Sequence, residues 1–305
     1  MISVLLPSLL LFSFGFFNLF GIRVQLGITM LFNFIVGILL FFLVKKIGWK
    51  FFQSNAKLFY WICIGILLFT YIVGLEVKGS KRWIDFFFFR FQGSEFFKIF
   101  FILFFADFFS KVSTRKNTIV AFISSLFYFL LPTFIIFKQP DLGNAMVYAF
   151  IFLIMLLFSA IPKKNVLQLV GFGVLLLPGG WFFLKEYQKH RILSFLQPHL
   201  DTQQNAYNMI QAMITIGSGK FLGRGLGLGT QSKLFFLPEN STDFAFSSLV
   251  EQFGFIGGIT TLVLFGVVLF ILFKRAYKFV LKEDEMGKFT FLYIVGIIAF
   301  LFFQI

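Results

Sequence analysis

The sequence is poor in charged residues. Only 13% of its 305 residues are Asp, Glu, Lys or Arg, whereas a soluble globular chain carries about 25%. Apolar residues make up 59% of the chain, and the mean hydropathy is +0.91. So few polar side chains cannot cover the surface of a soluble fold of this length. The composition therefore excludes a soluble domain and predicts a protein that is solvated by lipid.

Acidic residues, cysteine and histidine are also scarce. The chain has 13 Asp and Glu and 27 Lys and Arg, so the net charge is +14. Much of this excess lies in short segments between apolar runs, where positive charge marks the cytoplasmic side of a membrane protein; no nucleic-acid partner is expected. The single cysteine, Cys63, excludes an intrachain disulfide. The two histidines, His190 and His199, show no metal-ligand spacing.

Long apolar runs are abundant. A membrane-spanning helix needs about 20 mostly apolar residues, and about nine segments come near that length. These segments are Ile2–Phe20, Leu26–Val44, Leu58–Val77, Phe96–Phe109, Thr118–Phe137, Leu142–Ile161, Val166–Leu184, Phe244–Phe273 and Phe289–Ile305. The predicted fold class is an all-α polytopic membrane protein, with one transmembrane domain over residues 1–305.

Basic residues occupy alternate connections between these segments. They lie within residues 45–57, 111–116, 163–164 and 274–288. The positive-inside rule therefore predicts that these connections and the N-terminus face the cytoplasm. Two outer connections are long, Glu76–Lys98 and about 185–243. Long loops in compact proteins are usually functional or disordered, so we expect functional residues in these two.

Charged residues of the first outer connection allow two interpretations. Lys81 and Arg82 beside Trp83 suit a membrane interface. Glu95 and Lys98 stand three apart at the start of an apolar helix, so they share one face. Charges there either face a polar cavity or form a structural ion pair.

Asp141 follows Pro140 in the short connection between two spans. It is expected to cap the next helix, with substrate contact as the alternative.

The long outer connection combines basic residues with glycine. Arg191 and Gln211 precede a glycine-rich run, Gly217–Ser232, that contains Lys220, Arg224 and Gln231. Backbone N–H groups of such a run can approach a phosphate closely, and basic side chains supply the opposite charge. Since the run is no Walker A loop and is expected outside, a lipid diphosphate is the favoured ligand. A flexible loop without a ligand is the alternative.

The end of this connection carries carboxylates. Glu239 and Thr242 precede Asp243, which stands where the next helix begins, and Glu251 lies on nearly the same helical face. Asp243 is expected either to cap the helix or to act as a base, because partial desolvation would raise its pKa. These two roles are equally favoured by the residues alone.

Taken in order, these segments resemble the SEDS family of bacterial peptidoglycan polymerases, which includes RodA and FtsW. The resemblance rests on RWI with RFQGSEFFK, on QPDLG, on IGSG with the glycine run that ends in GTQS, on LPENSTDF and on EQFG. The KGSKRW segment and the GTQS run are more similar to RodA than to FtsW. The resemblance covers nearly the whole chain.

The resemblance implies a peptidoglycan glycosyltransferase that polymerises lipid II on the outer face of the bacterial cytoplasmic membrane, in cell elongation and shape maintenance. It implies Asp243 as general base, undecaprenyl diphosphate as leaving group and a class B penicillin-binding protein as partner. It places Glu95 and Lys98 at a polar cavity and matches Arg82 to an arginine of the family pattern. The substrate-binding candidates are Lys81, Arg82, Glu95, Lys98, Arg191, Gln211, Lys220, Arg224, Gln231, Glu239 and Thr242; Asp141 and Glu251 are structural or substrate-binding.

The chain departs from the family pattern at Gly93, where proline is usual, at Ser241, where histidine is usual, and at Gln252, where a second acid is frequent. It also ends before a segment that family members carry near their last spans, so it resembles a truncated member.

Other functions fit some of the same residues. In a lipid II flippase or transporter, Glu95 and Lys98 would line a path, but the polar residues concentrate on the outer side, which favours the enzyme. An FtsW-like polymerase or scaffold in cell division is a further alternative. No cofactor is expected; a divalent cation, Mg²⁺ or Mn²⁺, near Glu95 and Asp243 stays open.

Overall fold

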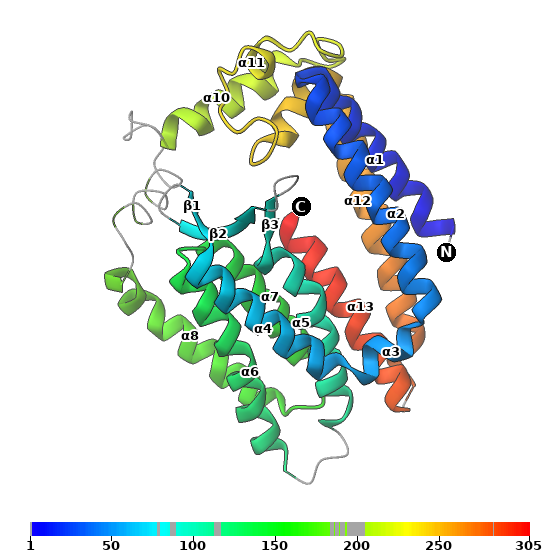
Figure 1. Cartoon of the computed structure of the whole chain (residues 1–305), viewed down its shortest axis with the longest axis vertical. Helices are drawn as coiled ribbons and strands as arrows, with labels where there is room; N and C mark the ends of the chain where they lie inside the picture. Colours follow the sequence, from blue (N-terminus) through cyan, green and yellow to red (C-terminus); the bar gives the residue numbers. More distant parts are fainter. Residues whose placement is uncertain are drawn as a thin grey trace. The chain divides into compact units, whose positions relative to one another are not determined.

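The computed structural model of the chain describes residues 2–77, 80–85, 90–112, 117–183, 186, 189, 193, 205–282 and 284–305. Helices dominate these residues (Figure 1). The elements are α1 (Ile2–Ile22), α2 (Val24–Ile47), α3 (Trp49–Ser54), α4 (Ala56–Val73), β1 (Leu75–Val77), β2 (Ser80–Asp85), β3 (Arg90–Gln92), α5 (Gly93–Ser110), α6 (Thr118–Lys138), α7 (Leu142–Leu157), α8 (Lys163–Phe183), α10 (Asn205–Ser218), α11 (Thr230–Lys233), α12 (Ala245–Val280) and α13 (Glu285–Gln304).

The chain divides into two compact units. Unit 1 comprises Met1–Leu43 and Gly173–Val268, and unit 2 comprises Val44–Phe172 and Leu269–Ile305. The boundaries between them fall inside α2, α8 and α12.

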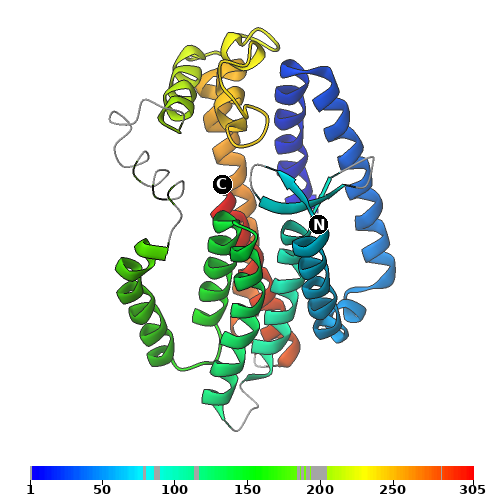
Figure 2. The same ribbon diagram turned by 60° about the vertical axis from the view of Figure 1, so that its left-hand side comes forward.

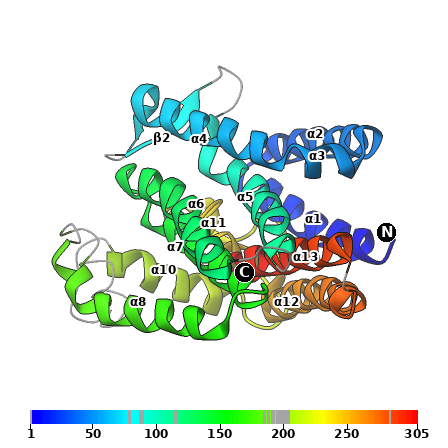
Figure 3. The same cartoon turned by 90° about the horizontal axis from the view of Figure 1, so that it is seen from below.

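Unit 2 is organised around α5, which packs against α4, α7 and α13. Figure 3 shows α5, α7 and α13 running side by side. One face of α5 carries Phe97, Phe101 and Phe105, all fully buried, because residues three and four apart share a helical face. The Tyr148 ring of α7 lies 4.9 Å from the Phe101 ring. These aromatic contacts form the centre of the apolar core of unit 2.

A three-stranded antiparallel sheet connects α4 to α5, in the order β1-β2-β3. Trp83 of β2 pairs with Leu75 of β1 and with Gln92 of β3. The β2 strand packs against α4 and α5, and Figure 2 shows the strands at one end of these helices. The sequence predicted an outer connection over Glu76–Lys98 and no strands, so the sheet is an addition to the expected all-helical pattern.

Unit 1 contains α1, most of α2, α10, α11 and the first part of α12. The Phe12 ring of α1 stacks on the Phe34 ring of α2 at 3.8 Å, and the Phe14 ring lies 5.5 Å from the Phe253 ring of α12. Both α1 and α10 contact the short helix α11. Aromatic packing therefore joins the long helices of this unit, while polar contacts described below join its loops.

The expected spans are helical in the structure, which is an all-α polytopic membrane fold. By length and apolar composition, six of the described helices, α1, α2, α4, α6, α12 and α13, are able to cross a membrane. The other three expected spans, α5, α7 and α8, are not among these six helices. The helix α7 has 16 residues and is short, α5 carries Glu95, Lys98 and Asp107, and α8 begins with two lysines. In the long outer connection, the stretch around Ala206–Ile216 lies in the amphipathic helix α10.

Candidate functional site

In unit 1 the helix α12 is interrupted at Gly254, whose backbone dihedrals are φ 70° and ψ −172°. In a continuous helix, the N–H groups of Phe255 and Ile256 would bond to the carbonyls four residues earlier. Here they donate instead to the carbonyls of Lys220 and Phe221, at 3.0 and 3.3 Å. The glycine-rich segment therefore takes over hydrogen bonds that the interruption removes from the helix.

The exchange is reciprocal. The backbone N–H of Arg224 donates to the carbonyl of Glu251 at 2.9 Å, and that of Gly225 donates to the carbonyl of Gln252 at 3.1 Å. Buried backbone groups are costly when unpaired, and these four bonds satisfy both sides of the interruption. The segment 220–225 is thus inserted into the hydrogen-bond ladder of α12.

Two glycines permit this close approach. At Gly223, with φ 87°, a Cβ atom would overlap the carbonyl of Gln252, and at Gly254, with φ 70°, it would overlap the backbone N of Gly223. Only glycine adopts these backbone conformations without strain. Several backbone N–H groups of the run are therefore already bonded to α12, which differs from the expected cradle of free N–H groups around a phosphate.

Glu251 is fully buried and anchors the next part of the run. Its carboxylate accepts hydrogen bonds from the backbone N–H of Gln231 at 2.8 Å and of Ser232 at 2.9 Å, and from the Ser232 hydroxyl. The Ser218 hydroxyl lies 3.4 Å away. A buried carboxylate needs such partners to offset its desolvation. Of its two expected roles, structural and substrate-binding, these contacts favour the structural one.

Gln252 connects the same loop to α1. Its Nε2 donates to the Asn18 side-chain oxygen at 2.7 Å, and its Oε1 accepts from the Gly227 N–H at 3.0 Å. Asn18 in turn donates to the Ser248 hydroxyl at 3.1 Å. An amide makes these contacts because it is both donor and acceptor. At Gln252 the family pattern often has an acid. Here both the nitrogen and the oxygen of the amide are hydrogen-bonded within unit 1.

Asp243 lies on the turn between α11 and α12, and its side chain is exposed. The turn is held by the Phe244 N–H, which donates to the Glu239 carbonyl at 3.1 Å, and by the Ser248 hydroxyl, which donates to the Asn240 carbonyl at 2.9 Å. Within the described residues, no hydrogen bond or ion pair engages the Asp243 carboxylate. The capping role is therefore not supported, and unit 1 does not desolvate the carboxylate as expected.

Other candidates in unit 1 surround this turn and the glycine run. The Thr242 hydroxyl donates to the Glu239 carboxylate at 3.2 Å. The Arg224 guanidinium donates to the Ser218 carbonyl at 3.1 Å and the Thr230 hydroxyl at 3.0 Å, and Lys220 is exposed with φ 50°.

Two candidates of the long outer connection remain. The Gln211 side chain is half-buried in α10. The expected contact at Arg191 falls outside the described residues.

A second polar cluster lies in unit 2, around Asp141. Its carboxylate accepts from the Asn144 backbone N–H at 3.3 Å, so it caps α7 as expected. It also accepts from the side chains of Asn144 at 2.9 Å and Gln92 at 3.1 Å, and lies 3.4 Å from the Arg82 guanidinium. The carboxylate therefore connects β2, the end of β3 and α7, while Lys81 is exposed beside them.

Glu95 and Lys98 form an ion pair, one of their two expected arrangements, with 2.8 Å between Nζ and Oε1. The Lys98 side chain is 1% exposed and the Glu95 side chain 46% exposed. The Lys98 ammonium also lies 5.5 Å from the centre of the Phe300 ring. A buried ammonium is costly unless paired, so Glu95 and the ring together compensate its burial.

The candidate residues thus fall into two groups, one in each unit. Sequence reasoning missed several polar side chains that hold these groups in place: Asn18, Gln92, Ser94, Asn144 and Asn240. Only Asn144, three residues after Asp141, had a local signal, because a helix cap and the third residue after it are neighbours.

No three His, Cys, Asp or Glu side chains gather as a metal site within the described ranges.

Sequence comparison finds relatives across most of the chain. The family model for FtsW, RodA and SpoVE, described as cell cycle protein, matches residues 4–305. The chain is 35% identical to peptidoglycan glycosyltransferase MrdB of Escherichia coli (strain K12) over 238 residues, which are 75% of this chain and 62% of that protein. It is 32% identical to a probable peptidoglycan glycosyltransferase FtsW of Wigglesworthia glossinidia brevipalpis over 263 residues, 85% of this chain and 68% of that protein.

Solved structures share the fold. One, from a peptidoglycan synthase complex that coordinates polymerization and crosslinking, matches with a TM-score of 0.81 at 22% identity and covers 100% of this chain and 84% of the other. The rod shape-determining protein RodA of Thermus thermophilus matches with a TM-score of 0.70 at 21% identity, over 100% of this chain and 82% of the other.

Proposed function

Because this chain belongs to the FtsW/RodA/SpoVE family of cell cycle proteins, we propose that the whole protein is a peptidoglycan glycosyltransferase. It polymerises lipid II on the outer face of the cytoplasmic membrane, and its role is RodA-like, in cell elongation and shape maintenance. The names of its relatives MrdB and FtsW support this activity. The chain spans 62% of the length of MrdB, so the activity is proposed for the whole protein.

The exposed carboxylate of Asp243 carries the proposal. It stands on a turn that Asn240 and Ser248 fix by hydrogen bonds, and no described residue uses it structurally. A carboxylate that is positioned but unpaired is able to accept a proton from a substrate hydroxyl.

In the proposed reaction, Asp243 takes the proton of the acceptor sugar hydroxyl. The oxygen then attacks the anomeric carbon of a lipid-linked donor, and the bond from that carbon to the diphosphate breaks. The undecaprenyl diphosphate leaves with the bonding electrons, and its negative charge favours nearby cations. Lys220 and Arg224, which lie on the glycine run of unit 1, are the proposed cationic contacts.

Partners and orientation are proposed with the activity. The apolar helices and the family make the chain a multi-pass bacterial membrane protein. We place its N-terminus in the cytoplasm and residues 185–243 outside, because the basic connections alternate with the spans. A class B penicillin-binding protein is the proposed partner.

The experiment compares lipid II polymerisation by the full-length gene product with its partner, as wild type and as Asp243→Asn. Asn keeps the shape of the side chain but cannot accept the proton, so glycan strands should be lost. The Glu186→Gln variant, which changes another exposed acid of unit 1, should polymerise normally. Strands from Asp243→Asn at the wild-type rate would move the base to another residue.

A lipid II flippase is the second candidate, since the buried Lys98 and its partner Glu95 are the kind of charges that line transport paths. The flippase hypothesis would be favoured if the folded wild-type protein moved lipid II across liposome membranes and made no glycan product.

A further inference from the structure

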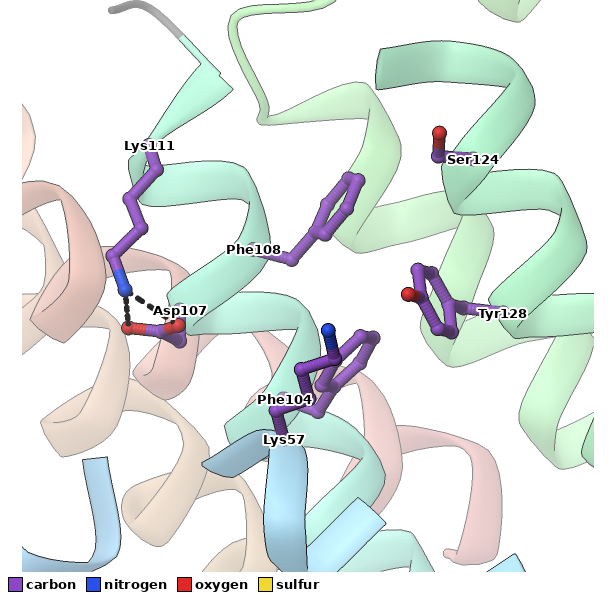
Figure 4. Close-up of a pocket in the computed structure, with 7 residues that line it drawn as sticks. All are labelled: Lys57, Phe104, Asp107, Phe108, Lys111, Ser124 and Tyr128. Atoms are coloured by element: carbon purple, nitrogen blue, oxygen red, sulfur yellow. Dashed lines mark hydrogen bonds and ion pairs between the residues drawn. The ribbon is translucent and has the colours of Figure 1, made fainter. Parts of the chain in front are cut away.

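A pocket of about 260 Å³ opens between α4, α5 and α6 of unit 2 (Figure 4). Its lining side chains are Lys57, Phe104, Asp107, Phe108, Lys111, Ser124 and Tyr128. Lys57 is the second residue of α4, and Lys111 follows the last residue of α5. The β-sheet connects the other ends of these two helices, so the pocket lies at the end of unit 2 away from the Asp141 cluster.

The position of Lys57 at the N-terminal end of α4 is unfavourable for a positive charge. It lies in the first turn of α4, which contains no acidic residue and whose preceding residue, Asn55, makes no side-chain cap bond. The N-terminal end of a helix carries partial positive charge and favours anions. No ion pair or hydrogen bond of the Lys57 ammonium occurs within the part of the chain that the structure describes. An anion beside this ammonium would relieve both unfavourable features.

Among the described residues that line the pocket, Asp107 alone carries a carboxylate, and Lys111 already engages it. The Lys111 ammonium lies 2.7 and 2.8 Å from the two Asp107 oxygens, as the dashed lines in Figure 4 mark. Lys111 also lies 3.9 Å from Glu285 of α13. Asp107 is therefore paired with Lys111, whereas no described acid forms an ion pair with Lys57.

Tyr128 supplies a fixed donor near Lys57. Its ring packs 4.9 Å from the Phe104 ring and 5.9 Å from the Phe108 ring, and its backbone carbonyl accepts from the Tyr60 hydroxyl at 2.6 Å. Among the described residues, none is hydrogen-bonded to the Tyr128 hydroxyl. In Figure 4 this hydroxyl and the Lys57 ammonium point into the same space beside Phe108. The Ser124 hydroxyl, in contrast, donates to the Val120 carbonyl.

We propose that this pocket binds a phosphate group, with the Lys57 ammonium and the Tyr128 hydroxyl as its donors. Charge-assisted hydrogen bonds to phosphate oxygens are strong, and the Phe104 and Phe108 rings exclude water from one side, which strengthens them. The phosphate belongs to a lipid head group or is free in solution. The site is separate from Asp243 and does not depend on the proposed polymerase activity.

The test is isothermal titration calorimetry of the full chain in detergent, prepared without phosphate. Three probes are titrated: dihexanoylphosphatidylglycerol, inorganic phosphate and dihexanoylglycerol, which has the same acyl chains without a phosphate. Wild type should bind phosphatidylglycerol and should not bind dihexanoylglycerol. Lys57→Gln should weaken binding about tenfold, and Tyr128→Phe severalfold, because each removes one hydrogen bond to an anion.

Lys50→Gln is the matched control, since Lys50 is an exposed lysine of unit 2 that does not line the pocket. It should bind as wild type does, and Lys57→Arg should retain most of the affinity. Inorganic phosphate that binds as tightly as phosphatidylglycerol would identify free phosphate as the source, whereas weaker binding would identify the lipid. The proposal fails if folded wild type binds neither phosphate probe, or if Lys57→Gln and Tyr128→Phe both bind as wild type does. If Lys57→Gln does not fold, the result with Tyr128→Phe decides.

Discussion

The buried carboxylate of Glu251 accepts a hydrogen bond from the backbone N–H of Ser232 at 2.9 Å and another from its hydroxyl. Ser232 lies in α11 and Glu251 in α12, so one side chain ties the end of the glycine run to the following helix. The turn that carries Asp243 lies between these two elements. The position of the proposed base therefore depends on a residue that is not itself expected to touch the substrate.

Glu251→Gln should lower the stability of unit 1. The amide replaces one acceptor oxygen by a donor, which then faces the N–H of Gln231 or the N–H and hydroxyl of Ser232, so a buried group loses its partner. Such a loss costs about 1–3 kcal/mol, and the thermal unfolding midpoint in detergent should fall. Glu186→Gln alters an exposed pair with Lys189 and should leave the midpoint nearly unchanged. Equal midpoints for the two variants would contradict the anchoring role.

Gly254→Ala should destabilise the protein more than any ordinary glycine substitution in α12. Its φ of 70° is strained for alanine, and the new Cβ would overlap the backbone of Gly223. A residue held in such a conformation costs about 1–3 kcal/mol, in addition to the overlap.

Gly266→Ala in the same helix serves as the control, because no atom lies within 4 Å of the Cβ it would add. Its stability should stay the same or rise by up to about 1 kcal/mol, since alanine favours helix. Thermal unfolding of both variants checks the prediction, and a Gly254→Ala protein as stable as Gly266→Ala would refute the inserted-loop geometry.

Glu95→Gln should lower the stability of the folded protein more than Lys98→Met does. The first change leaves the buried Lys98 ammonium without its carboxylate, which costs about 3 kcal/mol or more when a buried pair is broken. The second removes the buried charge and leaves Glu95, which is 46% exposed, in contact with solvent. Unfolding midpoints of the single and double variants measure the coupling. If Lys98→Met is the less stable single variant, the ammonium has partners beyond Glu95 and Phe300.

Asp141→Ala should destabilise the start of α7, because the cap and the contacts to Gln92 and Arg82 are lost together. Removing a helix cap costs about 0.5–2 kcal/mol. Asp141→Asn keeps an oxygen that can cap the helix but loses the negative charge beside Arg82. It should therefore lie between wild type and Asp141→Ala in hydrogen-exchange protection of the α7 amides. Equal protection in the two variants would show that the lost charge beside Arg82 outweighs the cap.

Local patterns predicted the features that depend on near neighbours in the chain. The predicted apolar segments are helices, and Asp141 caps α7 as expected. The pair Glu95–Lys98 followed from a spacing of three on a helical face. Each of these depends on periodicity or on contacts within one helical turn.

The β-sheet was not predicted, because its strands are short and the register of Trp83 with Gln92 depends on pairing between separate segments. The break at Gly254 was missed for the same reason. A glycine inside an apolar run is ordinary in a membrane helix, and only the approach of segment 220–225 reveals which one carries a positive φ.

The sequence by itself determined that this protein is a polytopic helical membrane protein, because the length of an apolar run is a local property of the chain. It also identified Asp243 and Glu251 as the acids to compare. Only the tertiary structure separated them: Glu251 is buried and bonded to Gln231 and Ser232, whereas Asp243 is exposed on its turn. The physical reason is that burial and hydrogen-bond partners are set by segments that meet in space, and the spacing of two acids along a chain does not contain that information.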